Sequence, residues 1–224
     1  MTPEQLAARH PRLYHVTTPG AWNTISRLGL LSASALLDLF GLDADRRAEL
    51  TARRRPREVR IEHPLHGTAV LNDNLPLSER ALASCLDDGL TPQDWLGLLN
   101  GRVFFWADPQ GLDRLMGARM NRNRPREVLV FDTLGLARAH AENIEISPIN
   151  SGSTIRRPAR RGRATFTPLL AKSYADWQRQ RGRQDRILEV TVRGGVADIA
   201  RYLVEVRTTA CAPLISAASS PPPG

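Results

Sequence analysis

Two titratable residues stand out because they interrupt apolar strand patterns. Glu189 lies in a run of apolar and β-branched residues, where an ionised carboxylate is costly to bury unless it faces a cleft or a partner. His15 alternates with Leu13 and Val16. A carboxylate in a cleft is suited to catalysis, whereas a glutamate on a solvated strand face is common. A lone strand histidine is more often a structural hydrogen-bonding group than a ligand.

A second candidate site is the polar loop of residues 147–154, which leads into an arginine-rich stretch. Its small polar side chains and Gly152 let backbone donors approach an anion closely. Arginine binds phosphates bidentately. The candidates for phosphate or nucleic-acid binding are Arg156, Arg157, Arg160, Arg161 and Arg163. A plain surface loop with a basic continuation explains the same pattern.

The overall charge agrees with an anionic partner. The formal net charge is +8, and Lys172 is the sole lysine, so arginine supplies nearly all the positive charge. Such a basic composition favours nucleic-acid binding. An arginine-rich genome that decorates a solvated face would give the same composition.

Several function classes lack support in the sequence. The chain has no P-loop, nucleophile elbow, paired zinc motif or dinucleotide-binding glycine fingerprint. Cys85 and Cys211 lie far apart without metal-ligand spacing, and His63 and His66 flank a turn. We therefore expect no metal site and no disulfide. Without an apolar run of membrane-spanning length or a signal-like N-terminus, we expect a cytoplasmic protein with no membrane contact.

Alternating strands and helices must position these residues. We expect strands at 12–17, 102–107, 127–131, 143–147, 186–192 and 201–207, and two strands within 59–71 around a turn at 63–67. We expect helices at 21–27, 33–40, 78–87, 91–100, 111–120, 132–141 and 174–183, and one capped by Asp43. The length fits a single domain over 1–212, with a helical insertion at about 41–101 and a disordered tail at 213–224.

Three segments resemble one known family. The strand 13–17, followed by a helix and Leu28-Gly29-Leu30, resembles the opening of ADP-ribosyltransferase-fold proteins, especially DarT-type DNA ADP-ribosyltransferase toxins and RNA 2′-phosphotransferases. The strand 103–107 resembles the aromatic strand that such enzymes place beneath the nicotinamide. Residues 188–196 resemble the DarT-type strand that carries the catalytic glutamate. The chain also resembles an uncharacterised bacterial family of similar length.

The resemblance implies an α/β (α+β) fold, with an ADP-ribosyltransferase-like split mixed sheet, peripheral helices and the insertion. It implies NAD as co-substrate, and Glu189 as the catalytic residue. The implied NAD-binding residues are Tyr14, His15, Thr17, Phe105, Trp106, Asn150 and Ser151. Strand register decides which of the two aromatic residues faces the nicotinamide. DarT-type proteins carry an arginine soon after the aromatic strand, whereas residues 107–110 lack one here.

The implied function is ADP-ribosyl transfer from NAD to a nucleic-acid base, with single-stranded or flipped DNA favoured because a stacked base hides its reactive edge. A protein acceptor stays open. We expect a monomer that acts as a toxin with an antitoxin partner, or as a defence factor. Two alternatives remain: an RNA 2′-phosphotransferase, against which Glu189 argues, and a non-enzymatic binder that uses the helix pair at 78–100 and the arginines.

Overall fold

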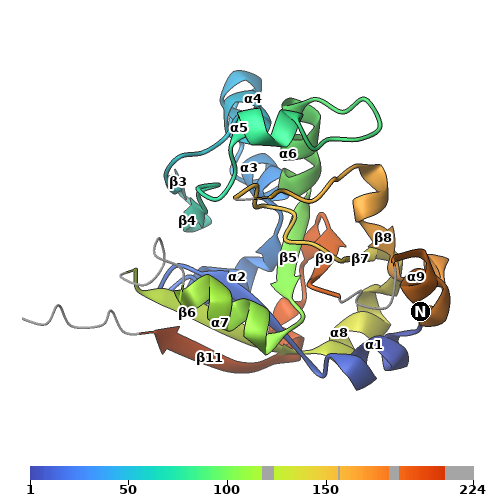
Figure 1. Cartoon of the computed structure of the whole chain (residues 1–224). Coiled ribbons are helices and arrows are strands. Elements are labelled where there is room, and N and C mark those ends of the chain that lie inside the picture. Colours follow the sequence, from blue (N-terminus) through green and yellow to red (C-terminus); the bar gives the residue numbers. More distant parts are fainter. Residues whose placement is uncertain (118–123, 156, 182–186, 210–224) are drawn as a thin grey trace, which may run out of the picture.

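The computed structural model describes residues 1–117, 124–155, 157–181 and 187–209. Its centre is a seven-stranded sheet in the order β11-β6-β1-β5-β9-β7-β8 (Figure 1). The strands are β1 (Arg12–Thr17), β5 (Arg102–Trp106), β6 (Arg126–Asp132), β7 (Ile144–Ser147), β8 (Thr167–Pro168), β9 (Glu189–Arg193) and β11 (Leu203–Thr209). The structure confirms the α/β (α+β) class. All pairings in this sheet are antiparallel, a more uniform arrangement than the expected mixed sheet.

The helices surround this sheet. They are α1 (Pro3–Arg9), α2 (Trp22–Leu28), α3 (Ala33–Leu39), α4 (Ala44–Ala52), α5 (Glu79–Ala83), α6 (Pro92–Asn100), α7 (Pro109–Gly117), α8 (Thr133–His140) and α9 (Tyr174–Arg181). Asp43 caps α4 and Asp132 caps α8, each through a side-chain oxygen that accepts a backbone N–H of the first turn. Both caps were predicted.

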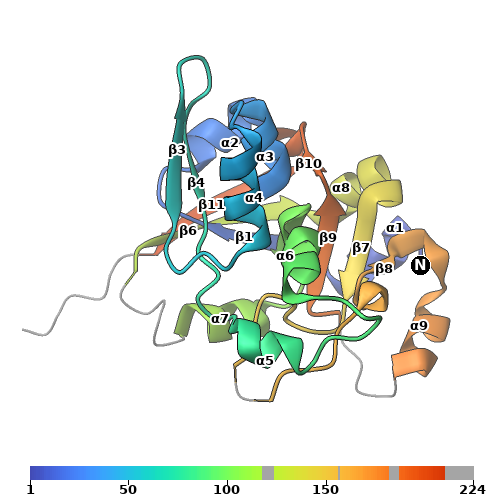
Figure 2. The ribbon, with the colours of Figure 1, turned by 90° about the horizontal axis from the view of Figure 1, so that it is seen from above.

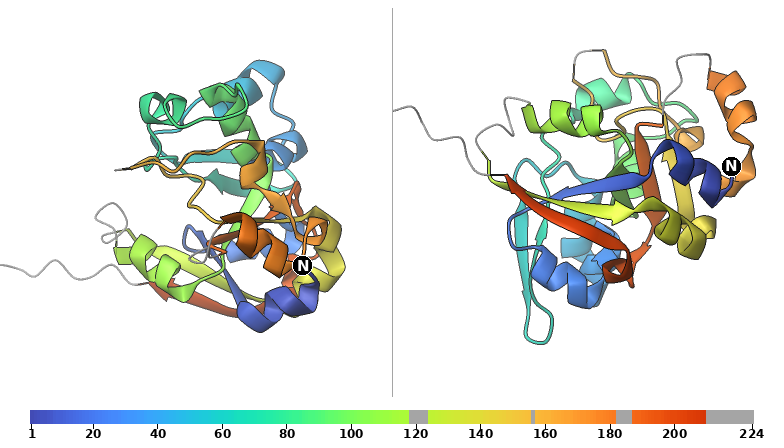
Figure 3. Two further views of the ribbon diagram at one scale, coloured as in Figure 1. Left: turned by 45° about the vertical axis from the view of Figure 1, so that its right-hand side comes forward. Right: turned by 90° about the horizontal axis from the view of Figure 1, so that it is seen from below.

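The two faces of the sheet carry different helices. The largest core cluster joins Leu13, Phe105 and Phe131 of the sheet to Leu6 of α1 and Leu136 of α8. A smaller cluster on the other face of β1 and β6 packs against α7. Figure 3 shows β1, β6 and β11 side by side in its right-hand view. The strand alternation therefore buries both faces, as expected for a sheet covered by helices.

The segment 41–101 is only partly helical. It contains the hairpin of β3 (Val59–His63) and β4 (Gly67–Leu71), which corrects the expectation of a helical insertion but confirms the two strands predicted within it. Ile61 and Leu71 pack against Leu37 of α3 and Leu50 of α4, so the hairpin gains a core of its own. Figure 2 shows this hairpin extending beside α2, α3 and α4.

Some local details differ from the sequence-based expectations. Helix α1 was not predicted, although Thr2 and Gln5 form a capping box around it. Helix α5 ends at Ala83 rather than near 87, because the carbonyl of Cys85 and the amide of Asp87 bind the backbone of Arg161 instead. The predicted helical residues 118–120 and 182–183, and the tail 213–224, lie outside the described residues. No helix of the described ranges is long and apolar enough to cross a membrane.

Candidate functional site

A pocket of about 640 Å³ lies where β1 and β5 separate. These two strands pair at one position, Tyr14 with Trp106. Beyond that pair, the walls come from β1, α2, β4, β5, the short strand β2 (Leu30–Leu31) and residues 72–76. The volume is typical of small-molecule and cofactor sites.

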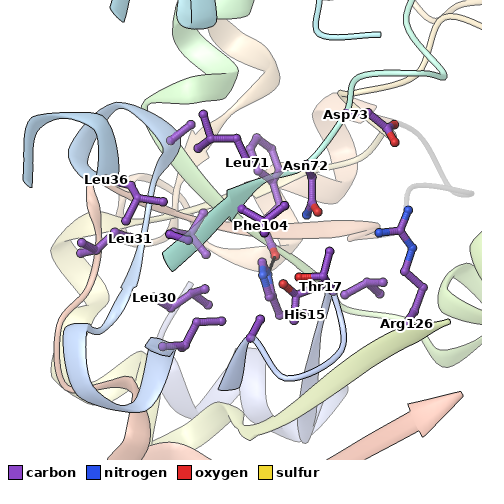
Figure 4. A pocket seen from close by; sticks show the side chains of 18 of the residues that line it. His15, Thr17, Leu30, Leu31, Leu36, Leu71, Asn72, Asp73, Phe104 and Arg126 are labelled. Carbon is purple, nitrogen blue, oxygen red and sulfur yellow. Dashed lines mark hydrogen bonds between the residues drawn. The ribbon is translucent and has the colours of Figure 1, made fainter. Parts of the chain in front are cut away.

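The pocket has two chemically distinct ends (Figure 4). The apolar end carries Leu30, Leu31, Leu36 and Leu71. The polar end carries Thr17, Asn72, Asp73 and Arg126, with His15 between the two ends. An amphipathic ligand, with an apolar or aromatic part and a polar part, fits this division.

His15 is a partly buried residue of the pocket wall, and its neutral ring offers a hydrogen-bond acceptor. Its Nδ1 lies 2.9 Å from the carbonyl oxygen of Phe104. Because a carbonyl can only accept, Nδ1 carries the proton and Nε2 presents a lone pair in the neutral ring. Burial lowers the pKa of His15, and the bond to Phe104 raises it by less. Nε2 has no hydrogen bond to any described residue and is therefore available to a hydroxyl or amide donor of a ligand.

Glu189 belongs to a strand beside the pocket strands but does not itself line the pocket. Trp106 pairs with Tyr14 on one side and with Glu189 on the other, so the three residues form one row across the sheet. Both carboxylate oxygens of Glu189 lie 3.2 Å from the backbone N–H of Ser151. Burial raises the pKa of Glu189 to about 7, whereas the Ser151 hydrogen bond and nearby Arg161 lower it.

Ser151 connects the buried glutamate to the pocket. Its carbonyl accepts hydrogen bonds from Nη1 of Arg161 at 2.9 Å and from Nε1 of Trp95 at 3.3 Å. Its Oγ is buried without a hydrogen-bond partner among the described residues. Buried hydroxyls normally have a partner, and Ser151 lines the pocket. A polar ligand atom is the simplest partner for this oxygen.

The structure separates the two aromatic candidates of β5. Trp106 lines the pocket, while Phe105 is fully buried in the main core because adjacent strand residues point to opposite faces. Tyr14 also lies outside the pocket lining, in the cluster that packs against α7. Asn150 is not part of the lining, although it precedes Ser151. His15, Thr17, Trp106 and Ser151 are thus the predicted NAD-binding residues that the structure brings together.

The predicted arginine site does not form a single cluster. Arg156 lies outside the described residues, and Arg157, Arg160 and Arg163 are exposed. Arg160 donates to Asp87. Arg161 is instead buried, because its guanidinium is held by the carbonyls of Ala159 and Ser151. None of the four described arginines of this stretch lines the pocket.

Four arginines that were not among the predicted site residues line the pocket: Arg55, Arg60, Arg102 and Arg126. Burial lowers the pKa of Arg55 to about 10, and its guanidinium donates to Oδ1 of Asn100 and to the carbonyl of Asn72. Arg126 begins β6 and is 9% exposed, and its side chain makes no hydrogen bond or ion pair with a described residue. Arg55 belongs to an arginine cluster at 53–57, but no local pattern distinguishes Arg55 or Arg126 from the arginines beside it.

The paired histidines of the hairpin turn have a structural explanation. The rings of His63 and His66 stack with centroids 4.4 Å apart, and both contact Phe40. Nδ1 of His63 accepts the backbone N–H of Leu65 and of His66. Within the described ranges, no group of three or more His, Cys, Asp or Glu side chains is arranged to hold a metal ion.

The fold and pocket define an α+β protein with a small-molecule-sized pocket at the separation of two central strands. Residues 11–203 match the model of a family of unknown function (DUF7002), and the chain belongs to that family. Among solved structures, the chain is similar to Thermosipho africanus DarTG in complex with ADP-ribose, with a TM-score of 0.45 and 13% identity. The match covers 87% of this chain and 43% of the other, so this chain spans less than half of that structure. No curated protein is significantly similar to the chain.

Proposed function

We propose that the chain is an NAD-dependent ADP-ribosyltransferase whose substrate pocket lies between β1 and β5. The row of Tyr14, Trp106 and Glu189 carries the proposal. Each of these residues comes from one of the three segments that resemble ADP-ribosyltransferases. The segments are far apart in the sequence but form adjacent strands. The pocket lies beside this row and includes His15, Trp106 and Ser151 in its wall.

The pocket chemistry fits cleavage of the bond between nicotinamide and ribose. This reaction passes through a state with positive charge on the ribose, so it needs a bound, oriented dinucleotide and a nearby negative group. In the proposed complex, Nε2 of His15 accepts a ribose hydroxyl and Trp106 provides an aromatic face for the nicotinamide. The unpartnered Oγ of Ser151 binds a polar atom of the same substrate.

Glu189 supplies the carboxylate in this proposal. Its pKa of about 7 makes it partly ionised near neutral pH, which suits a group that accepts and returns a proton. Because Ser151 separates it from the pocket, the proposal requires the loop around Ser151 to shift when substrate binds. The transfer rate should then rise as the pH passes through about 7, since the ionised form is the active one.

The proposed acceptor is a nucleic-acid base. The exposed Arg157 and Arg163 follow the pocket-lining residues Ser151 and Gly152 along the chain. In the proposed complex, these exposed arginines bind the phosphates of a single strand while one base enters the site. The net charge of +8 supports the same class of acceptor.

Transfer of label from NAD tests the proposal. NAD labelled in the adenylate part is offered with single-stranded DNA, duplex DNA, RNA and a protein extract in parallel. Glu189→Gln should lower transfer by at least about 100-fold, the usual scale for a lost acid or base catalyst. Glu205→Gln is the matched control, because Glu205 is exposed on β11 and pairs with Arg207 there.

Label on single-stranded DNA that disappears in Glu189→Gln but persists in Glu205→Gln would support both the activity and the acceptor. Label on the protein extract alone would support the activity and contradict the nucleic-acid acceptor. An absence of transfer and of NAD consumption with every acceptor would contradict the enzymatic proposal. DNA binding that is unaffected by NAD would then favour a simple nucleic-acid binder.

A further inference from the structure

Arg126 is a charged side chain that the proposed chemistry above does not use. It is 9% exposed, and its guanidinium has no hydrogen bond or ion pair with any described residue. The guanidinium nitrogens are not among the fully buried unpartnered atoms of the described residues, so they remain accessible from the pocket. Figure 4 shows this group directed toward Asn72 and Asp73 at the polar end of the pocket. The guanidinium is therefore available to an anion from outside the chain.

The neighbouring acidic groups do not neutralise Arg126. The carboxylate of Asp73 is paired with Nη1 of Arg124 at 2.8 Å. Arg55, which also lines the pocket, remains positive at neutral pH because its pKa is about 10. Asp73 is the one carboxylate among the described residues that line the pocket, whereas Arg55, Arg60, Arg102 and Arg126 all line it. The polar end has a net positive charge and favours an anionic ligand.

Glu127 shows where the anion does not bind. Its carboxylate accepts the backbone N–H of Gly20 at 2.9 Å and of Trp22 at 2.8 Å, so the first turn of α2 already has its own negative charge. A phosphate at that position would displace this cap and meet a like charge. The phosphate is instead expected at the polar end of the pocket, to which Arg126 is directed.

We infer that the polar end is a phosphate site and that Arg126 determines the pocket's specificity for a phosphate-bearing nucleotide. Arginine can donate two parallel hydrogen bonds to a phosphate. Thr17 and Asn72 offer further polar groups beside it. The leucines of the apolar end leave room for the base or another apolar part of the same ligand. Naming the phosphate as the pyrophosphate of NAD rests on the proposed function.

Calorimetric titration of three probes tests this inference. The probes are ADP-ribose, adenosine and inorganic pyrophosphate, and each is titrated into wild type, Arg126→Gln, Arg126→Lys and Arg207→Gln. The last variant is the matched control, because it removes one exposed arginine of β11, the strand that pairs with β6. Far-UV circular dichroism checks that each variant is folded, and Arg126→Lys keeps the positive charge if the glutamine variant is unstable.

Wild type should bind ADP-ribose more tightly than adenosine. Arg126→Gln should weaken the affinity for ADP-ribose by about 10- to 100-fold and leave the affinity for adenosine unchanged, as expected for the loss of a charged, bidentate contact. Arg126→Lys should lose part of that affinity, and Arg207→Gln should lose none. Equal affinity of Arg126→Gln and wild type for ADP-ribose would overturn the inference, as would a wild type that binds neither phosphate-bearing probe.

The outcome is separable from that of the proposed function. Arg126-dependent binding of pyrophosphate and ADP-ribose, combined with no transfer from NAD, would support the phosphate site and reject the transferase. Transfer from NAD with wild-type affinity in Arg126→Gln would support the transferase and reject the role of Arg126.

Discussion

Replacing Glu189 with glutamine should change how the stability of the protein depends on pH. The amide keeps the size of the side chain and an oxygen that accepts the Ser151 N–H, but it cannot ionise. The wild-type carboxyl has a folded-state pKa of about 7, which burial raises from an ordinary value of 4.5. Between these two values, the folded chain holds a proton that the unfolded chain has released. Wild-type stability therefore falls as pH rises through this window.

The size of the effect follows from the separation of the two pKa values. Each pH unit between them is worth about 1.4 kcal/mol, so the full window from 4.5 to about 7 is worth about 3 kcal/mol. This loss of wild-type stability is absent below the window and complete above it. Glu189→Gln does not show it at any pH, because the amide cannot ionise. The free energy of unfolding of the variant, relative to wild type, should increase by about 3 kcal/mol from low to high pH.

Urea unfolding, followed by tryptophan fluorescence at several pH values from about 4 to about 8, measures this difference. Subtracting wild type from Glu189→Gln cancels the titration of the other groups. Glu205→Gln serves as the control, because pairing with Arg207 lowers the pKa of the exposed Glu205 and no rise of this kind is expected. A difference that stays flat over the window would refute the claim that burial dominates at Glu189. A difference that falls with pH would show that Arg161 and Ser151 stabilise the ionised form.

Two further substitutions test the packing that supports the site. Glu145→Gln should destabilise the fold by about 3–5 kcal/mol, because it leaves the buried guanidinium of Arg102 without its charged partner at 2.7 Å. The matched variant Glu205→Gln breaks a half-exposed ion pair with Arg207 and should cost less than about 1 kcal/mol. Equal losses of unfolding free energy in the two variants would contradict this. Gly29→Ala should destabilise by more than about 1 kcal/mol, since φ is +89° and a Cβ would lie 2.6 Å from a backbone atom. Gly41→Ala has similar strain at φ +66° but free space around it, so it should have the smaller effect on the thermal midpoint.

Much of the fold could be predicted from local patterns. The strand that ends at Thr17, the hairpin around residues 63–67 and the helices capped by Asp43 and Asp132 all follow from short-range alternation, turn residues and caps. Helix α1 also has such a signal, the capping box of Thr2 and Gln5, which predicts its first turn.

The site was less predictable because it depends on contacts between distant segments. Strand alternation shows that Phe105 and Trp106 point to opposite faces, but only the pairing with Tyr14 and Glu189 assigns each face. Arg161 belongs to a stretch that resembles a solvated basic surface, yet contacts with Trp95 and Ser151 bury it. No local pattern distinguishes it from its exposed neighbours.

A crystal structure of Glu189→Gln with NAD tests the assignment of the pocket most directly, since the variant should bind the dinucleotide without consuming it. The expected result is NAD between β1 and β5, with a ribose hydroxyl at Nε2 of His15, the nicotinamide against Trp106 and a phosphate at Arg126. NAD bound elsewhere, or an empty pocket in crystals grown with saturating NAD, would contradict the assignment of this pocket as the NAD site.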